Sequence, residues 1–105
     1  MPIRERMMIM TDLEKVLKNN LHNYKKVKET NRLFCCNTII LIAETYEKIS
    51  DGKEIYKHGG HGINFCNKIY KVEVIIDGET VFERYGKDAN EMNKNYLLAL
   101  DMCQG

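Results

Sequence analysis

The residues best suited to metal chemistry lie in a glycine-rich stretch in the middle of the chain. His58 and His61 are separated by two residues, and Cys66 follows the second histidine by five positions. Neutral imidazole and thiolate groups bind zinc, so these side chains could form a site if another cysteine completed it. Structural zinc sites usually consist of two close ligand pairs, whereas this stretch has one pair and a single cysteine. We expect a loop without a cofactor, and a small metal-binding protein is the alternative.

The same three side chains are the grouping closest to a nucleophilic site, which needs a thiol or hydroxyl, a base and an orienting acid. The residues around Cys66 carry no motif of such a site. Glu44 and Glu47 form a carboxylate pair, but at helical spacing they would lie on a charged, solvated side. We therefore predict that the protein is not an enzyme and name no catalytic residue.

Lysines suited to phosphate contact gather near the N-terminus. The run Thr11-Asp-Leu-Glu14 has the form of a capping box, which predicts a helix from there to about Lys28. Apolar residues recur on one face of this helix: Leu13, Val16, Leu17, Leu21, Tyr24 and Val27. The opposite face is basic: Lys15, Lys18, His22, Lys25 and Lys26. We expect a solvated surface, and a nucleic-acid-binding module using the four lysines is the alternative function.

A surface for a protein partner is predicted on the last helix, from about Asp88 to Cys103. Its expected core face consists of apolar residues at helical spacing: Ala89, Met92, Tyr96, Ala99, Leu100 and Cys103. Leu98 and Met102 lie four residues apart on the side that should face water. Isolated exposed apolar residues are common, and a contact with a partner protein or a second copy is the alternative. We name these two residues as the predicted partner-binding surface.

The stretch from Leu33 to Ile49 has two interpretations. Apolar residues at three-four spacing favour a helix: Cys35, Ile39, Ile42, Tyr46 and Ile49. The β-branched run Thr38-Ile-Ile-Leu-Ile42 indicates a strand instead, with a turn at Ser50-Asp-Gly-Lys53. In either case the apolar part from Leu33 to Ala43 should lie in the centre of the core, with the Cys35-Cys36 pair packed inside it.

The C-terminal third contains a clear hairpin signal. A strand from Ile69 to Ile76 alternates apolar and polar residues, and Asp77-Gly78 is a favoured type I′ turn pair. The return strand runs from Glu79 to Tyr85. This pattern predicts one buried face and one mostly solvated face.

Length and composition are those of one small globular domain. The chain has 105 residues, of which 44% are hydrophobic and 30% charged, with a net charge of +1. We expect a flexible segment over residues 1–10 and a single domain over 11–105. Four cysteines without a regular framework indicate reduced thiols and a cytoplasmic location. No apolar run is long enough for a membrane span, so we expect no membrane contact.

Part of the chain resembles a known RNA-binding family. The run from Tyr70 to Val81, then Gly86 to Met92 and Tyr96 to Leu100, is similar to the last hairpin and helix of a double-stranded-RNA-binding domain. The likeness covers the C-terminal third and implies an α-β-β-β-α order. That family has a lysine cluster at the start of its last helix, where this chain has Asp88-Ala-Asn-Glu91. The resemblance thus implies the shape of this segment without its phosphate-binding lysines.

Together these patterns predict an α+β fold, in which helices pack on one face of a small antiparallel sheet. Small size, missing catalytic motifs and an excess of Lys and Asn lead us to the hypothesis of a non-enzymatic binding protein that acts through protein–protein contacts. It would serve as an accessory or inhibitor (anti-defence) protein of a phage or mobile element. A homodimer and a nucleic-acid partner remain open alternatives.

Overall fold

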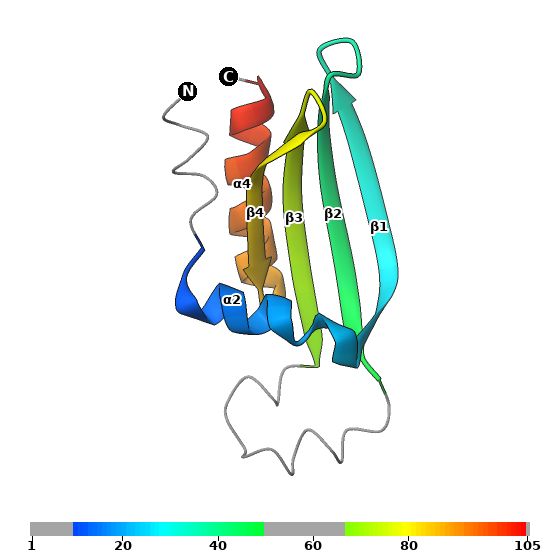
Figure 1. Ribbon diagram of the computed structural model, residues 1–105, viewed down its shortest axis with the longest axis vertical. Helices are drawn as coiled ribbons and strands as arrows, with labels where there is room; N and C mark the ends of the chain where they lie inside the picture. Colours follow the sequence, from blue (N-terminus) through cyan, green and yellow to red (C-terminus); the bar gives the residue numbers. More distant parts are fainter. Residues whose placement is uncertain (1–9, 50–66, 105) are drawn as a thin grey trace.

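The computed structural model describes residues 10–49 and 67–104. Two helices and a short 3-10 turn accompany a four-stranded antiparallel sheet of strand order β1-β2-β3-β4 (Figure 1). The elements are α2 (Asp12–Asn19), η1 (Leu21–Asn23), β1 (Tyr24–Phe34), β2 (Ile39–Lys48), β3 (Lys68–Ile76), β4 (Glu79–Gly86) and α4 (Ala89–Gln104). Neither helix of the described ranges has the length and apolar character needed to cross a membrane.

Helix α2 starts at the predicted capping box. The backbone N–H of Glu14 donates to Thr11 Oγ1 at 3.1 Å, and the N–H of Thr11 donates to Glu14 Oε1 at 2.9 Å. The helix ends at Asn19, so the prediction that it continues to Lys28 is wrong. Asn20 ends it, because its side-chain amide donates to the carbonyl of Val16 at 2.8 Å.

Strands replace the helix that was favoured between Leu33 and Ile49, and the strand interpretation is confirmed. β1 and β2 are joined by a turn in which three non-glycine residues have positive φ: Cys35 (51°), Cys36 (58°) and Asn37 (72°). The N–H of Thr38 closes the turn by donating to the carbonyl of Cys35 at 3.2 Å. The cysteine pair is therefore exposed at a turn and not packed in the core. The alternative turn at Ser50–Lys53 lies outside the described residues.

The C-terminal hairpin and helix are confirmed. β3 and β4 meet at Asp77 and Gly78, whose φ values of 52° and 82° are those of the favoured turn. Phe82 pairs with Val74, which in turn pairs with Leu41 of β2, so these three side chains share one face. They are buried against α4.

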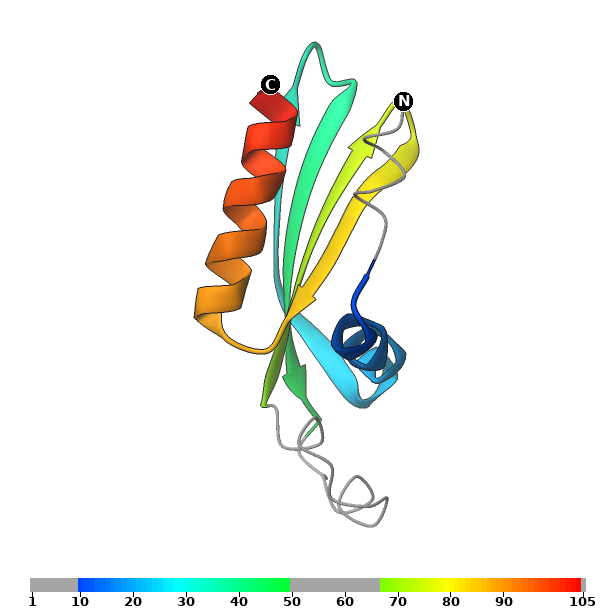
Figure 2. The same cartoon turned by 90° about the vertical axis from the view of Figure 1, so that its left-hand side faces the viewer.

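The two helices pack on opposite faces of the sheet (Figure 2). Most of the core lies under α4, and the residues buried there are Leu41, Val72, Val74, Val81, Phe82, Ala99 and Cys103. A smaller cluster lies under α2 and contains Leu17, Tyr24, Ile69 and Tyr85. The α+β class is confirmed. Two details differ from the prediction. The sheet has four strands instead of three, and α2 packs on the face opposite α4 because Ile69 and Tyr85 point to that face.

Candidate functional site

The two edge strands of the sheet differ in how far other parts of the chain cover them. β4 forms one edge, and the side chain of Glu14 closes part of it. Glu14 Oε2 accepts a hydrogen bond from the backbone N–H of Tyr85 at 3.1 Å, and the side chain is 6% exposed. A helix thus occupies a backbone donor that an edge strand would otherwise offer to another chain.

β1 forms the other edge, and it is open over almost its whole length. Of its 11 residues, Tyr24 is buried, Phe34 is half-buried and every residue between them is exposed. In the described part of the chain its only strand neighbour is β2. Helix α4 packs on β2, β3 and β4, which leaves both faces of β1 in contact with solvent. A strand exposed on both faces and on its outer edge is unusual for a small domain.

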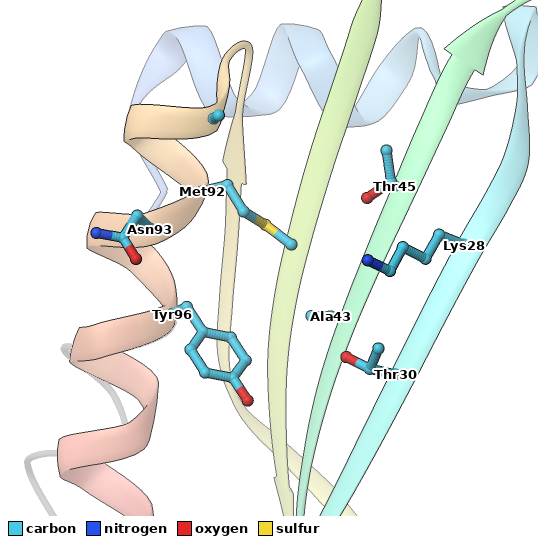
Figure 3. A pocket seen from close by; sticks show the side chains of 8 residues that line it. Lys28, Thr30, Ala43, Thr45, Met92, Asn93 and Tyr96 are labelled. Carbon is cyan, nitrogen blue, oxygen red and sulfur yellow. The ribbon is translucent and has the colours of Figure 1, made fainter.

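A groove runs between β1 and α4 over the surface of the sheet (Figure 3). It encloses about 290 Å³ and is lined by Lys28, Thr30, Ala43, Thr45, Ala89, Met92, Asn93 and Tyr96. Met92 and Tyr96 extend from the helix toward the strands, and Ala43 lies on the floor between them and Thr30. Because the alanine is small and β1 is not covered by the helix, the groove stays open along its β1 side.

The charge along β1 is mainly positive. The strand carries four cationic residues and one acidic residue: Lys25, Lys26, Lys28 and Arg32, and Glu29. Lys26 forms ion pairs with Glu29 and, at 3.3 Å, with Glu44 of β2. These contacts raise the pKa of Lys26 and lower that of Glu29, in each case chiefly through the hydrogen bond that joins them.

Lys28 and Arg32 are placed to meet an incoming group on the α4 side of β1. Lys28 and Arg32 have no carboxylate partner among the described residues, and both are exposed. The guanidinium of Arg32 lies over the ring of Phe34, 5.2 Å from its centroid. This contact holds the charge on the α4 side of the strand without neutralising it.

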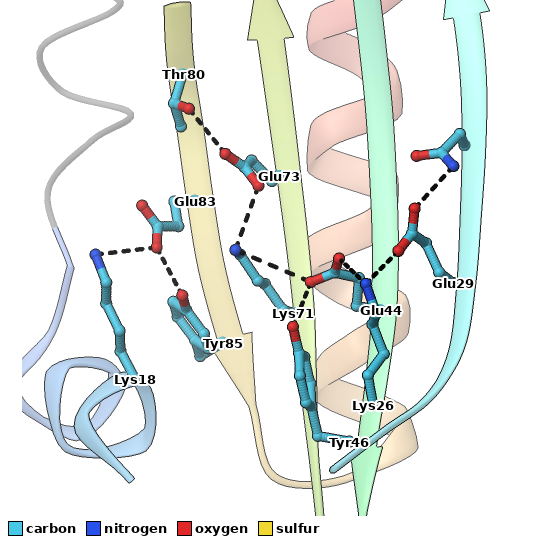
Figure 4. A network of polar contacts seen from close by, with 11 residues as sticks. Lys18, Lys26, Glu29, Glu44, Tyr46, Lys71, Glu73, Thr80, Glu83 and Tyr85 are labelled. Atoms are coloured by element: carbon cyan, nitrogen blue, oxygen red, sulfur yellow. Dashed lines mark hydrogen bonds and ion pairs between the residues drawn. The ribbon is translucent and has the colours of Figure 1, made fainter. Parts of the chain in front are cut away.

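The opposite face of the sheet carries an ion-pair network (Figure 4). Lys71 lies between Glu44 at 3.9 Å and Glu73 at 3.3 Å, while Lys18 of α2 reaches Glu83 at 3.2 Å. The hydroxyl of Tyr85 donates to Glu83 at 2.6 Å. The other contacts within this network are Lys26 to Glu44, Lys26 to Glu29, Asn31 to Glu29, Tyr46 to Glu44 and Thr80 to Glu73.

Contacts within the network shift the pKa values of Tyr46, Glu83 and Tyr85. Burial and the hydrogen bond to Glu83 raise the pKa of Tyr85, and burial with the bond to Glu44 does the same for Tyr46. Burial alone would raise the pKa of Glu83, but the bonds from Tyr85 and Lys18 outweigh it and hold that pKa below its ordinary value. The raised pKa of Tyr85 and the lowered pKa of Glu83 both favour the hydrogen bond from the protonated hydroxyl to the ionised carboxylate, which helps to hold this face of the sheet together.

The predicted lysine set is divided between two elements. Lys15 and Lys18 lie on α2, whereas Lys25 and Lys26 lie on β1, so the single basic helix face that the sequence predicted does not exist. Lys18 and Lys26 are also engaged in the ion pairs of the sheet. Basic residues instead accumulate along β1, whose first half, up to Lys28, was expected to be helical.

The predicted partner surface on α4 is also divided. Leu98 is 51% exposed and lies beside the exposed Leu97. Met102 is half-buried and packs against the core under the helix. The large apolar residues exposed on α4 are therefore Leu97 and Leu98, without Met102. Ala89, which was expected on the core face, is also exposed because it lies at the first residue of the helix.

The proposed metal ligands His58, His61 and Cys66 lie outside the described residues. Within residues 10–49 and 67–104, no group of three or more His, Cys, Asp or Glu side chains could hold a metal ion. Burial raises the pKa of the Cys103 thiol, and Cys35 and Cys36 are free and exposed.

Comparison with protein-family models, with curated proteins and with solved structures finds no match to this chain. The resemblance of its C-terminal third to a double-stranded-RNA-binding domain stays a prediction.

Proposed function

We propose that this protein is a non-enzymatic binding protein whose contact surface is the open edge strand β1. The observation that carries the proposal is the exposure of β1 from Lys25 to Leu33. An edge strand presents a row of unpaired backbone N–H and C=O groups, which can bind an extended segment of another protein as an added strand.

The contrast between the two edges supports β1 as the contact surface. On β4 the backbone N–H of Tyr85 is occupied by Glu14. No comparable side-chain cap is found on the backbone from Lys25 to Leu33 within the described part of the chain. Proteins usually block edge strands because open ones associate without control, so an edge left open over this length is consistent with a use in binding.

Charge favours a different protein over a second copy as the partner. If two copies of β1 paired antiparallel around Thr30, Lys28 of one would lie opposite Arg32 of the other. Like charges at opposed positions destabilise a strand pair. Exposed lysines on an edge strand also discourage self-association. A homodimer through β1 is therefore the weaker alternative.

A nucleic-acid partner is the second candidate, and the same basic residues favour it. Lys25, Lys28 and Arg32 are exposed along one strand and could contact successive phosphates. Binding of this kind weakens steeply as salt rises, because it depends on counterion release. We rank it second because Lys26, in the same strand, is already paired with carboxylates.

An origin as an accessory or inhibitor protein of a phage or mobile element also remains a proposal. Its support is the small size of the chain and its high content of Lys and Asn.

Blocking the open edge tests the proposed function. Consecutive residues of a strand direct their backbone groups to opposite sides, so either Thr30 or Asn31 has an outward N–H. Amide hydrogen exchange in the free protein identifies the outward N–H, because it exchanges faster than the N–H that is bonded to β2. Proline is then introduced at the residue that carries the outward N–H. Tagged wild-type and variant chains are then purified from the native cell.

We expect a protein that co-purifies in fixed stoichiometry with the wild type and is lost from the proline variant. Thr80→Ser, a conservative change on β4, is the matched control and should retain the partner. A partner retained by a folded proline variant would overturn the proposal, as would co-purified nucleic acid that dissociates in high salt.

A further inference from the structure

The geometry points to the chemistry of the partner: we infer that β1 binds an extended acidic segment, with two carboxylate side chains four positions apart and an apolar side chain midway between them. This inference rests on the proposed function. It adds the pattern of residues that the segment must carry.

The positions of Lys28 and Arg32 set the spacing of the carboxylates. Lys28, Thr30 and Arg32 pair with Thr45, Ala43 and Leu41 of β2, so they share the face of the sheet that α4 covers. Four residues of strand span about 13 Å. A partner strand beside β1 has the same rise, so carboxylates opposite Lys28 and Arg32 must also be four positions apart.

The groove determines the residue between the two carboxylates. A side chain opposite Thr30 on the α4 side would reach the open border of the groove, whose lining includes Ala43, Met92 and Tyr96. The volume of about 290 Å³ can receive a branched aliphatic side chain. Burial of that side chain adds an apolar contribution to the backbone pairing and the two ion pairs.

The other face of β1 favours a protein segment over a nucleic acid. Glu29, Asn31 and Leu33 alternate with the cations and face away from α4. An exposed leucine is suited to the alternating side chains of a second strand. Lys26, the lysine on this face of β1, is already paired with Glu29 and Glu44, so it adds little to the binding of a phosphate backbone.

A defined peptide probes the pattern directly. We would synthesise a capped ten-residue peptide with glutamate at its third and seventh positions, valine at its fifth, and serine and threonine elsewhere. The controls replace both glutamates by lysine, or move them to adjacent positions. Each peptide is titrated into the isotope-labelled full chain, and binding is followed by the NMR shifts of the backbone amides. A single-stranded oligouridine of ten nucleotides is titrated in the same way to represent a nucleic-acid partner.

We expect the glutamate peptide to shift amides of β1 and to bind roughly tenfold more tightly than either control, as two cross-strand ion pairs would produce. The double variant K28E/R32E should reverse the preference and favour the lysine peptide. K15E/K94E, which reverses charges outside β1, should leave it unchanged.

Three results would overturn the inference. These are equal binding of the three peptides, tighter binding of the oligouridine than of the glutamate peptide, and no binding at millimolar peptide. If the edge-blocking experiment meanwhile identifies a partner that depends on β1 but lacks this acidic pattern, the proposed function stands and this inference alone fails.

Discussion

Glu14 Oε2 accepts a hydrogen bond from the backbone N–H of Tyr85 at 3.1 Å, while its Oε1 accepts one from the N–H of Thr11 at 2.9 Å. One carboxylate therefore completes the cap of α2 and occupies the edge of β4. This relationship fixes the helix to the sheet and leaves β1 as the edge available for a partner.

Removal of this carboxylate should destabilise the fold. Glu14→Ala leaves the backbone donors of Thr11 and Tyr85 without acceptors, and we expect it to lower the free energy of unfolding by about 1 to 3 kcal/mol. Urea denaturation measures the change. Asp12→Ala, in the exposed first turn, is the control and should cost roughly 0.5 kcal/mol or less. Equal effects of the two substitutions would contradict a bridging role for Glu14.

Acid should weaken the contact between α2 and the sheet through Glu83. Its native pKa lies below the ordinary value of 4.5, so its contribution to stability is fully present above that pH. As the pH falls below 4.5, the unfolded state takes up the proton first and the contribution declines until the native pKa is passed.

Glu83→Gln isolates this contribution. We expect the difference in unfolding free energy between wild type and variant to be constant between pH 6 and 8, at about 1 to 3 kcal/mol. It should shrink as acid is added. Denaturation curves at a series of pH values measure it, and a difference that grows in acid would show that the sign is wrong.

The turn between β1 and β2 should be open to stabilisation. Cys36 and Asn37 both have positive φ, a conformation that side chains other than glycine and asparagine adopt at a cost. Changing them to Asn and Gly, the preferred pair for such a turn, should raise the melting temperature. We expect the free energy of unfolding to increase by about 1 kcal/mol. Cys36→Ala with Asn37 unchanged is the control for loss of the thiol and should give no such increase.

The two predicted partner residues of α4 should respond differently to truncation. Met102→Ala removes a side chain that packs on the core and should cost about 1 to 2 kcal/mol. Leu98→Ala removes an exposed side chain and should change stability by roughly 0.5 kcal/mol or less. Thermal denaturation compares them. A large loss at Leu98 would contradict its exposure.

The capping box and the hairpin turn were predicted correctly because each pattern is typical of one local structure. Thr11 and Glu14 form the capping box because their side chains complete each other's hydrogen bonds within one turn. Asp77 and Gly78 form the hairpin turn because few other pairs tolerate two positive φ values. Both features depend only on neighbouring residues.

The strand that carries the proposed site was missed for a different reason. A strand buried on one face alternates apolar and polar residues, but β1 is exposed on both faces and has no such period. Tyr24 and Val27 instead continued the helical spacing of Leu17 and Leu21, so the pattern favoured a longer helix. The turn at Cys35–Asn37 contains no glycine or proline, and it could not be recognised from its residues.

Amide hydrogen exchange on the complex tests the central claim most directly. The full chain is compared alone and with the co-purified partner or the glutamate peptide. We predict that alternate amides between Lys25 and Leu33 exchange rapidly in the free protein and become protected in the complex, while Leu97 and Leu98 are unchanged. Protection at α4 or α2, with β1 exchanging as it does in the free protein, would contradict the account.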